Sequence, residues 1–177
     1  MLNALRRNSS RSRLVRSLYG ALSSQARSPV FFLAFGVADT LDGRFDLVTL
    51  HAWLVFERLR VAAMGDTAQA LSNVIFIGFD EALRDLGAGD MSMGRKIKQM
   101  GEAFNGRIQA YDGAADEVEL AAAILRNVYR GATNRHREAL ALARYASGAR
   151  RHLAASDVSM GVLDFGPPPQ VTLDHDA

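Results

Sequence analysis

The chain has 177 residues, the length of a single domain, with 49% hydrophobic and 23% charged residues, close to the average for globular proteins. This composition excludes a wholly disordered chain, a collagen-like fibre and a protein with many membrane spans. Cysteine is absent, which excludes disulfide frameworks, iron–sulfur clusters and cysteine nucleophiles. The net charge of +2 is unevenly distributed: residues 1–38 hold six arginines and no acid, residues 39–153 are balanced, and residues 154–177 hold four aspartates without Lys or Arg.

The basic start of the chain predicts an amphipathic helix over residues 13–27, preceded by a flexible basic segment at residues 1–12. Leu14, Leu18 and Leu22 recur on one face of this helix, and Arg13 and Arg16 lie on the opposite arc. Such a segment fits a transit peptide, a helix that lies on anionic lipid, or an arm that touches RNA. A secretory signal fits less well because arginines interrupt the apolar stretch. No apolar run approaches the ~20 residues that a membrane span needs.

The remaining elements, in chain order, are helices separated by turn-forming residues. Pro29 ends the first helix, and residues 30–44 are expected to form an irregular connection that closes with the turn pair Asp42-Gly43. Further helices are expected over residues 45–64, 67–86, 93–112, 116–130 and 134–153. The first of these is apolar on all sides through Phe56, which predicts a buried central helix. Residues 154–177 are expected to form a disordered acidic tail. The predicted fold is all-α, one domain of about six helices over residues 13–153.

The helix over residues 93–112 has an unusual charge pattern and three internal glycines. Its first turns carry three cations, Arg95, Lys96 and Lys98, which oppose the helix dipole. We give equal weight to two interpretations of these residues, a solvated face and a binding site for an anionic partner. Each glycine costs about 1 kcal/mol relative to Ala in a helix interior. Gly94, Gly101 and Gly106 therefore predict either a closely packed neighbouring helix or a bend.

No pattern in the sequence supports catalysis, a metal site or a cofactor. The four histidines lack ligand spacing, and His51 within an apolar helix is expected to be a satisfied core residue. Residues 89–96 approach a Walker A loop, but Arg95 replaces its lysine and Lys96 its hydroxyl residue. A Gly-x-Ser-x-Gly elbow is absent, and so are interleaved aromatic residues that would stack on bases. We therefore favour a binding or structural protein over an enzyme, without specific nucleic-acid recognition.

Four ordered stretches within residues 17–130 resemble the ubiquinol–cytochrome c chaperone family, in its bacterial form. They are residues 18–27, residues 36–60 opening on GVADTLDGRFD, residues 95–112 opening on RKIKQMGEAF, and residues 120–129. One departure is Asn105, where bacterial members more often have tyrosine. The resemblance implies a small helical assembly chaperone, without cofactor or catalysis, that binds newly made cytochrome b. It also implies a ribosome-proximal role, a small partner subunit, and a cytoplasmic location at the inner membrane or, alternatively, in the mitochondrial matrix.

A client with exposed apolar helices and charged loops needs a groove with hydrophobic walls and a charged rim. We expect the walls from Trp53, Phe104 and Tyr111, and the rim from Arg95, Lys98, Arg107 and Asp112, with core packing as the competing interpretation of each aromatic residue. The alternative function is a tether on the membrane or ribosome surface. Its contacts would come from the basic N-terminal helix, through Arg13, Leu14, Arg16, Leu18 and Leu22.

Overall fold

The computed structural model describes residues 2–85 and 90–167 of the chain, which are almost entirely helical. The described residues contain no β-strand, so the predicted all-α class is confirmed. Among these residues, six long α-helices agree with the prediction of about six, and a seventh, α2, has only five residues. In chain order the elements are α1 (Leu2–Ala26), α2 (Pro29–Leu33), α3 (Leu41–Val61), α4 (Gly65–Asp85), α5 (Asp90–Asp112), α6 (Glu117–Asn127), the 3-10 helix η1 (Thr133–Arg135), α7 (His136–Ala155) and the 3-10 helix η2 (Val158–Met160).

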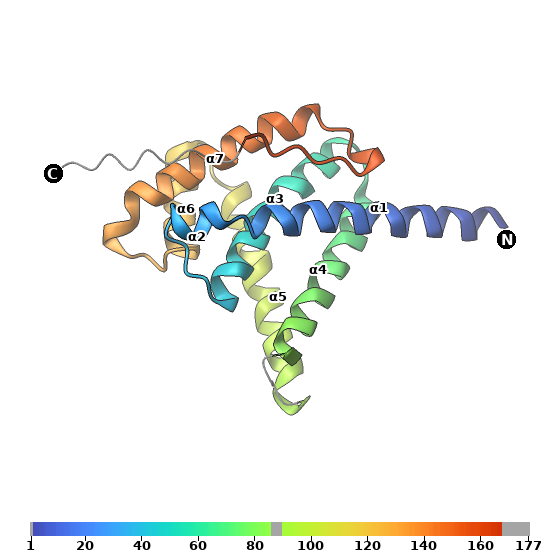
Figure 1. Cartoon of the computed structure of the whole chain (residues 1–177), viewed down its shortest axis with the longest axis horizontal. Helices are drawn as coiled ribbons and strands as arrows, with labels where there is room; N and C mark the ends of the chain where they lie inside the picture. Colours follow the sequence, from blue (N-terminus) through green and yellow to red (C-terminus); the bar gives the residue numbers. More distant parts are fainter. Residues whose placement is uncertain (1, 86–89, 168–177) are drawn as a thin grey trace.

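Helix α3 lies at the centre of the molecule, as its all-round apolar sequence predicted. Every residue from Phe45 to Val55 is buried. Helices α1, α4, α5 and α7 pack against it. Helices α4 and α5 run together away from α1 and α7 toward one narrow end of the molecule, while the N-terminal part of α1 projects beyond the body (Figure 1).

The start of α3 differs from the prediction of a turn at Asp42-Gly43 and a helix from Phe45. The helix begins four residues earlier because the side chain of Thr40 caps it, accepting a hydrogen bond from the Gly43 backbone N–H at 3.2 Å. Gly43 is needed for packing rather than for a turn: a Cβ there would lie 1.9 Å from the Ala38 carbonyl oxygen. Asp42 consequently lies in the first turn of the helix.

Two segments that were expected to be irregular or disordered contain short helices and pack against the core. Residues 29–33, within the expected irregular connection, form the single turn α2, with Pro29 at its first position and Phe31 buried. Residues 154–167, expected to belong to the disordered tail, finish α7, form η2 and bury Val158 and Phe165. The guanidinium of Arg58 holds this segment by donating to the carbonyls of Leu153 and Ser156 at 2.9 and 3.0 Å. The rest of the expected tail, residues 168–177, lies outside the described residues.

The glycines that the sequence singled out in α5 have no close neighbour. A Cβ at Gly94 or Gly106 would meet nothing within 4 Å, and one at Gly101 would only touch Phe76 at 3.9 Å. The close approach between helices occurs instead at Gly78 of α4, where a Cβ would lie 2.2 Å from the Tyr19 hydroxyl of α1. Close packing therefore does not explain the α5 glycines.

Candidate functional site

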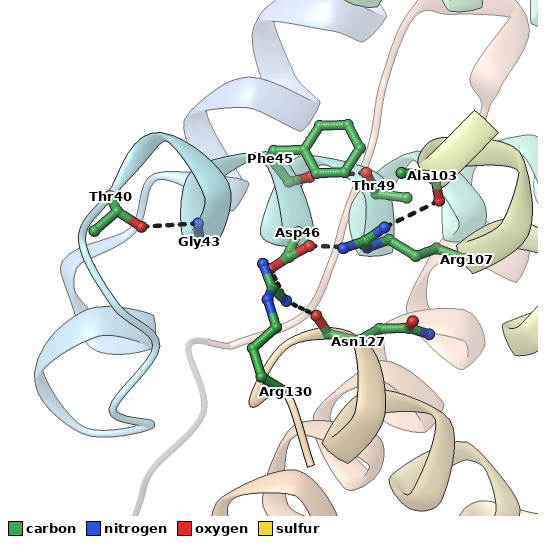
Figure 2. A network of polar contacts seen from close by, with 9 residues as sticks. All are labelled: Thr40, Gly43, Phe45, Asp46, Thr49, Ala103, Arg107, Asn127 and Arg130. Atoms are coloured by element: carbon green, nitrogen blue, oxygen red, sulfur yellow. Dashed lines mark hydrogen bonds and ion pairs between the residues drawn. The ribbon is translucent and has the colours of Figure 1, made fainter. Parts of the chain in front are cut away.

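A buried carboxylate in the first half of α3 collects two arginines from distant parts of the chain. The side chain of Asp46 has no exposed surface. Its Oδ1 accepts from Nε of Arg107 on α5 at 2.8 Å, and its Oδ2 lies 2.8 Å from Nη1 of Arg130, which follows α6. Figure 2 shows the two guanidinium groups approaching Asp46 from different sides. We call these three residues the Asp46 cluster.

The local surroundings of each arginine keep its guanidinium aimed at Asp46. Arg107 also donates to the Ala103 carbonyl at 3.1 Å, and its guanidinium carbon lies 5.0 Å from the centre of the Phe45 ring. Arg130 has a left-handed backbone, with φ of 56°, and donates from Nη1 to the Asn127 carbonyl. A left-handed conformation costs a residue with a side chain about 1–2 kcal/mol, so the turn after α6 holds Arg130 in place at some strain.

Burial has a larger effect on the pKa of Asp46 than the two arginines have. Burial raises the pKa of the Asp46 carboxyl to about 6, because the charged form loses its hydration, and the charges of Arg107 and Arg130 only partly offset this effect. Arg107 is 15% exposed and Arg130 is 51% exposed. The cluster thus contains two cations on one carboxylate, and one of the cations faces solvent.

A cavity of about 400 Å³ opens directly beside this cluster, between the start of α3, the end of α4 and the middle of α5. Its apolar lining comes from Leu41, Phe45, Leu83, Met100 and Ala103. The polar side chains around it are Asp42, Lys96, Gln99, Arg107 and Arg130. We call this space the α3–α5 cavity. An apolar floor with cations around it suits a ligand that is mostly apolar and carries negative charge.

Comparison with known proteins identifies the family. A family model described as "Ubiquinol-cytochrome C chaperone" matches residues 33–159, which is most of the chain. The chain belongs to this family. A crystal structure described as the Cbp3 homolog from Brucella abortus superposes with a TM-score of 0.82 and 29% sequence identity, covering 94% of this chain and 97% of that chain. A search of curated protein sequences finds no match. The family resemblance seen in the sequence is confirmed. The family match begins at residue 33, so it leaves out the first of the four stretches, residues 18–27, and it extends farther toward the C-terminus.

The three aromatic residues expected to wall a client groove lie in the core of this chaperone-family fold. Trp53, Phe104 and Tyr111 are each at most 2% exposed. Trp53 and Tyr111 pack with ring centres 5.5 Å apart, and the Trp53 indole N–H donates to Oδ1 of Asp112 at 2.8 Å. Core packing, the competing interpretation, therefore describes all three in this structure, and Asp112 orients the tryptophan from the surface.

The expected cationic rim is divided between two places on α5 of the chaperone. Arg95 and Lys98 are exposed and form no ion pair with a described residue, whereas Arg107 belongs to the Asp46 cluster. Lys96, which was not among the residues expected to form the rim, lines the α3–α5 cavity. The structure therefore joins Arg107 to Lys96 at one cavity and leaves Arg95 and Lys98 outside its lining.

The expected membrane face of α1 is mostly turned into the protein. Leu18 and Leu22 have no exposed surface and Leu14 is half-buried, because α1 packs on α3 and α4. These leucines cannot enter lipid while the chaperone is folded as described. Arg13 and Arg16 are exposed, as the pattern predicted, and form no ion pair within the described chain. No helix of the described chain is sufficiently long and apolar to cross a membrane.

Sequence analysis missed Asp46 and Arg130 as parts of the site. Asp46 is the one acid within the predominantly apolar run from Phe45 to Phe56. A single carboxylate in such a run requires a buried cation, which is a signal that the sequence does contain. Nothing in the sequence singled out Arg130, since its role depends on the turn after α6.

His51 is a structural residue, as the sequence analysis expected. Its ring is fully buried, with Nδ1 2.7 Å from the Leu47 carbonyl and Nε2 2.8 Å from the Tyr145 hydroxyl. Nδ1 must carry the proton to donate to a carbonyl, so Nε2 accepts from Tyr145. Burial lowers the pKa of His51 to about 4. Within the described residues no group of three potential ligands could hold a metal ion.

Proposed function

We propose that this protein is an assembly chaperone that binds newly made cytochrome b and supports biogenesis of the ubiquinol–cytochrome c reductase complex, without catalysis. The observation that carries the proposal is membership of the ubiquinol–cytochrome c chaperone family over residues 33–159. The α3–α5 cavity supports it, because apolar surface beside cations suits a membrane-protein client with exposed apolar helices and charged loops. In a bacterium, such a chaperone would work in the cytoplasm at the inner membrane.

The client surface would run along α5 from the cavity to the exposed basic residues near its start. Arg95 and Lys98 would supply long-range attraction to acidic loops, and Lys96 and Arg107 would act at the cavity. Trp53, Phe104, Tyr111 and Asp112 would support the shape of α5 from beneath, since the aromatic residues are in the core. A small partner subunit and the ribosome would bind the surface that lies outside α5 and the cavity.

The test is loss of the gene combined with in-cell crosslinking. We expect deletion to lower cytochrome b haem absorbance and assembled cytochrome bc complex, while other respiratory complexes keep their levels. Cytochrome b should be the main crosslinked partner, and Arg95→Glu with Lys98→Glu should reduce that crosslink. The matched control is Arg126→Glu with Arg137→Glu, which changes the charge equally at exposed arginines of α6 and α7 that make no ion pair with a described residue. Normal cytochrome b haem spectra in the deletion strain would refute the proposal.

A second candidate function is surface tethering through α1. It is favoured by one observation: the N-terminal part of α1 projects from the body, with Arg13 and Arg16 exposed on the same helix (Figure 1). Because Leu18 and Leu22 are buried, the contact would be electrostatic, to anionic lipid or to ribosomal RNA, rather than insertion into the bilayer.

Charge reversal tests the tether more cleanly than truncation, since removing residues 1–28 would also remove buried leucines. Arg13→Glu with Arg16→Glu should abolish flotation of the full chain with vesicles rich in phosphatidylglycerol at low salt. Arg126→Glu with Arg137→Glu, which removes equal charge from exposed positions elsewhere, is the control. Flotation that survives reversal at α1 would exclude this helix as the lipid contact.

A further inference from the structure

The Asp46 cluster leaves the α3–α5 cavity with more positive than negative charge. Two guanidiniums share the single carboxylate of Asp46, so one positive charge has no partner within the cluster. Lys96 adds another cation to the lining and makes no ion pair with any residue that the structure describes. Asp42 is the one lining residue of opposite charge in this part of the chain. The unbalanced charge lies where a ligand in the cavity would meet it.

Arg130 is positioned to bind a second anion without releasing the first. Its Nη1 forms an ion pair with Asp46 and donates a hydrogen bond to the Asn127 carbonyl, and about half of the side chain is exposed. A guanidinium has five N–H donors in a planar fork, and those of Arg130 that contact neither Asp46 nor the Asn127 carbonyl remain available to a second anion. The ion pair with Asp46 and the hydrogen bond to the Asn127 carbonyl hold this guanidinium beside the cavity.

The apolar part of the cavity determines what kind of anion fits. Phe45, Leu83 and Met100 line the space next to the cations, and methionine adapts to side chains of different shape. Inorganic phosphate would leave this apolar surface unfilled. A helical peptide segment with large apolar side chains and one carboxylate would fill it and also reach the cations.

We propose that the α3–α5 cavity recognises a carboxylate carried by an apolar segment of another protein, with Arg130 and Lys96 as the residues that receive it. The inference rests on the proposed chaperone function, because it assigns a chemical class of client segment to the same site. An acidic residue that interrupts an apolar client helix would be the feature recognised. Such a residue is costly for a membrane helix to expose to lipid, so a chaperone that binds it would cover it before assembly.

The test uses the full chain and two fluorescein-labelled peptides of fourteen residues. Both are amphipathic helices with Leu, Phe and Ala on one face and Gln and Ser on the other. They differ only at one central position of the apolar face, which is Glu in one peptide and Gln in the other. Fluorescence anisotropy at 0.15 M salt should show about tenfold tighter binding of the Glu peptide, the magnitude expected of one charge-assisted hydrogen bond. Arg130→Gln and Lys96→Gln should each reduce this preference to about twofold or less.

Two controls separate recognition from general effects. Arg126→Gln removes a positive charge from an exposed position of α6 outside the cavity lining and should keep the tenfold preference. Lys96 does not contact Asp46, so Lys96→Gln tests the site even if Arg130→Gln alters folding. Equal binding of the two peptides, binding of neither, or equal loss in Arg126→Gln would overturn the inference. The cytochrome b phenotype of the deletion strain would be unaffected by that result, so the two proposals fail separately.

Discussion

Replacing Asp46 by Asn asks whether burial or ion pairing dominates at the centre of the site. Asparagine keeps the shape and one acceptor oxygen but removes the charge that Arg107 and Arg130 share. Removing one partner of a buried ion pair usually destabilises a protein by about 3–5 kcal/mol. The pKa of Asp46 predicts the opposite effect, namely that removing this charge stabilises the protein. Burial raises this pKa above its ordinary value despite both arginines, so folding favours the neutral form of the side chain relative to the unfolded chain.

The magnitude follows from the pKa difference between the folded and unfolded chains. A rise from 3.8 to about 6 corresponds to about 3 kcal/mol. The folded-state pKa is the higher one, so this contribution to stability is fully present below pH 3.8 and is lost as the pH rises through about 6. Asp46→Asn, which cannot ionise, should therefore exceed the wild type by about 3 kcal/mol at pH 7.5 and by only about 1 kcal/mol at pH 4.5.

The assay is urea unfolding of wild type and Asp46→Asn, followed by circular dichroism at both pH values. Using the difference between the two proteins cancels the contribution of His51, which titrates in the same range. Asp39→Asn is the control, because the exposed ion pair with Arg44 lowers the pKa of Asp39 and gives the opposite pH dependence. A loss of stability in Asp46→Asn at pH 7.5 that diminishes toward pH 4.5 would refute the reasoning and show that the arginines outweigh burial.

Three further substitutions test the packing that holds the site. Tyr145→Phe should lower the free energy of unfolding by about 1–3 kcal/mol, because Nε2 of His51 loses its buried donor. The control is Tyr19→Phe, which should change the free energy of unfolding little because the Tyr19 hydroxyl makes no hydrogen bond with a described residue. Equal losses in the two variants would contradict the assignment. Gly78→Ala should lower the free energy of unfolding in denaturant by about 1–3 kcal/mol, because the added methyl group would crowd the Tyr19 hydroxyl. Most of that loss should disappear in the Tyr19→Phe background. A loss that is unchanged in that background would show that α1 and α4 do not approach each other there. Arg130→Gly should be about 1 kcal/mol more stable than Arg130→Ala in the same measurement, because only glycine relieves the left-handed backbone, and equal stabilities would remove the evidence for strain.

Much of the fold was predictable because its signals are local. Helical periodicity in apolar residues placed the long helices after α1 to within four residues, and the run without a polar face in residues 45–56 identified α3 as the central helix. The predicted start of α1 was wrong: the helix begins at Leu2, within the segment expected to be flexible, eleven residues before the expected start. The start of α3 was misplaced because Asp42-Gly43 has the composition of a turn. In the structure the Thr40 side chain caps the helix there, and the close approach of the Ala38 carbonyl, rather than a turn, requires glycine at position 43.

The candidate site was predictable only in part, because the sequence shows residue types but not which residues meet. The basic residues of α5 were recognised, yet the division between Arg107 inside the cluster and Arg95 on the open surface depends on how α5 lies against α3. Arg107 and Asp46 are 61 residues apart. No periodic pattern connects positions at that separation, and Arg130 reaches the same carboxylate from yet another part of the chain.

The sequence alone determined the all-α class, the buried central helix and the family resemblance, since periodicity and ordered motifs are properties of the chain itself. Only the tertiary structure decided what each apolar face touches. The leucine pattern of α1 is the same for a helix on lipid and for a helix on protein, and packing against α3 and α4 assigns Leu18 and Leu22 to the core. The same packing brings a carboxylate and two arginines together beside the cavity, because burial of a charge forces distant partners to converge on it.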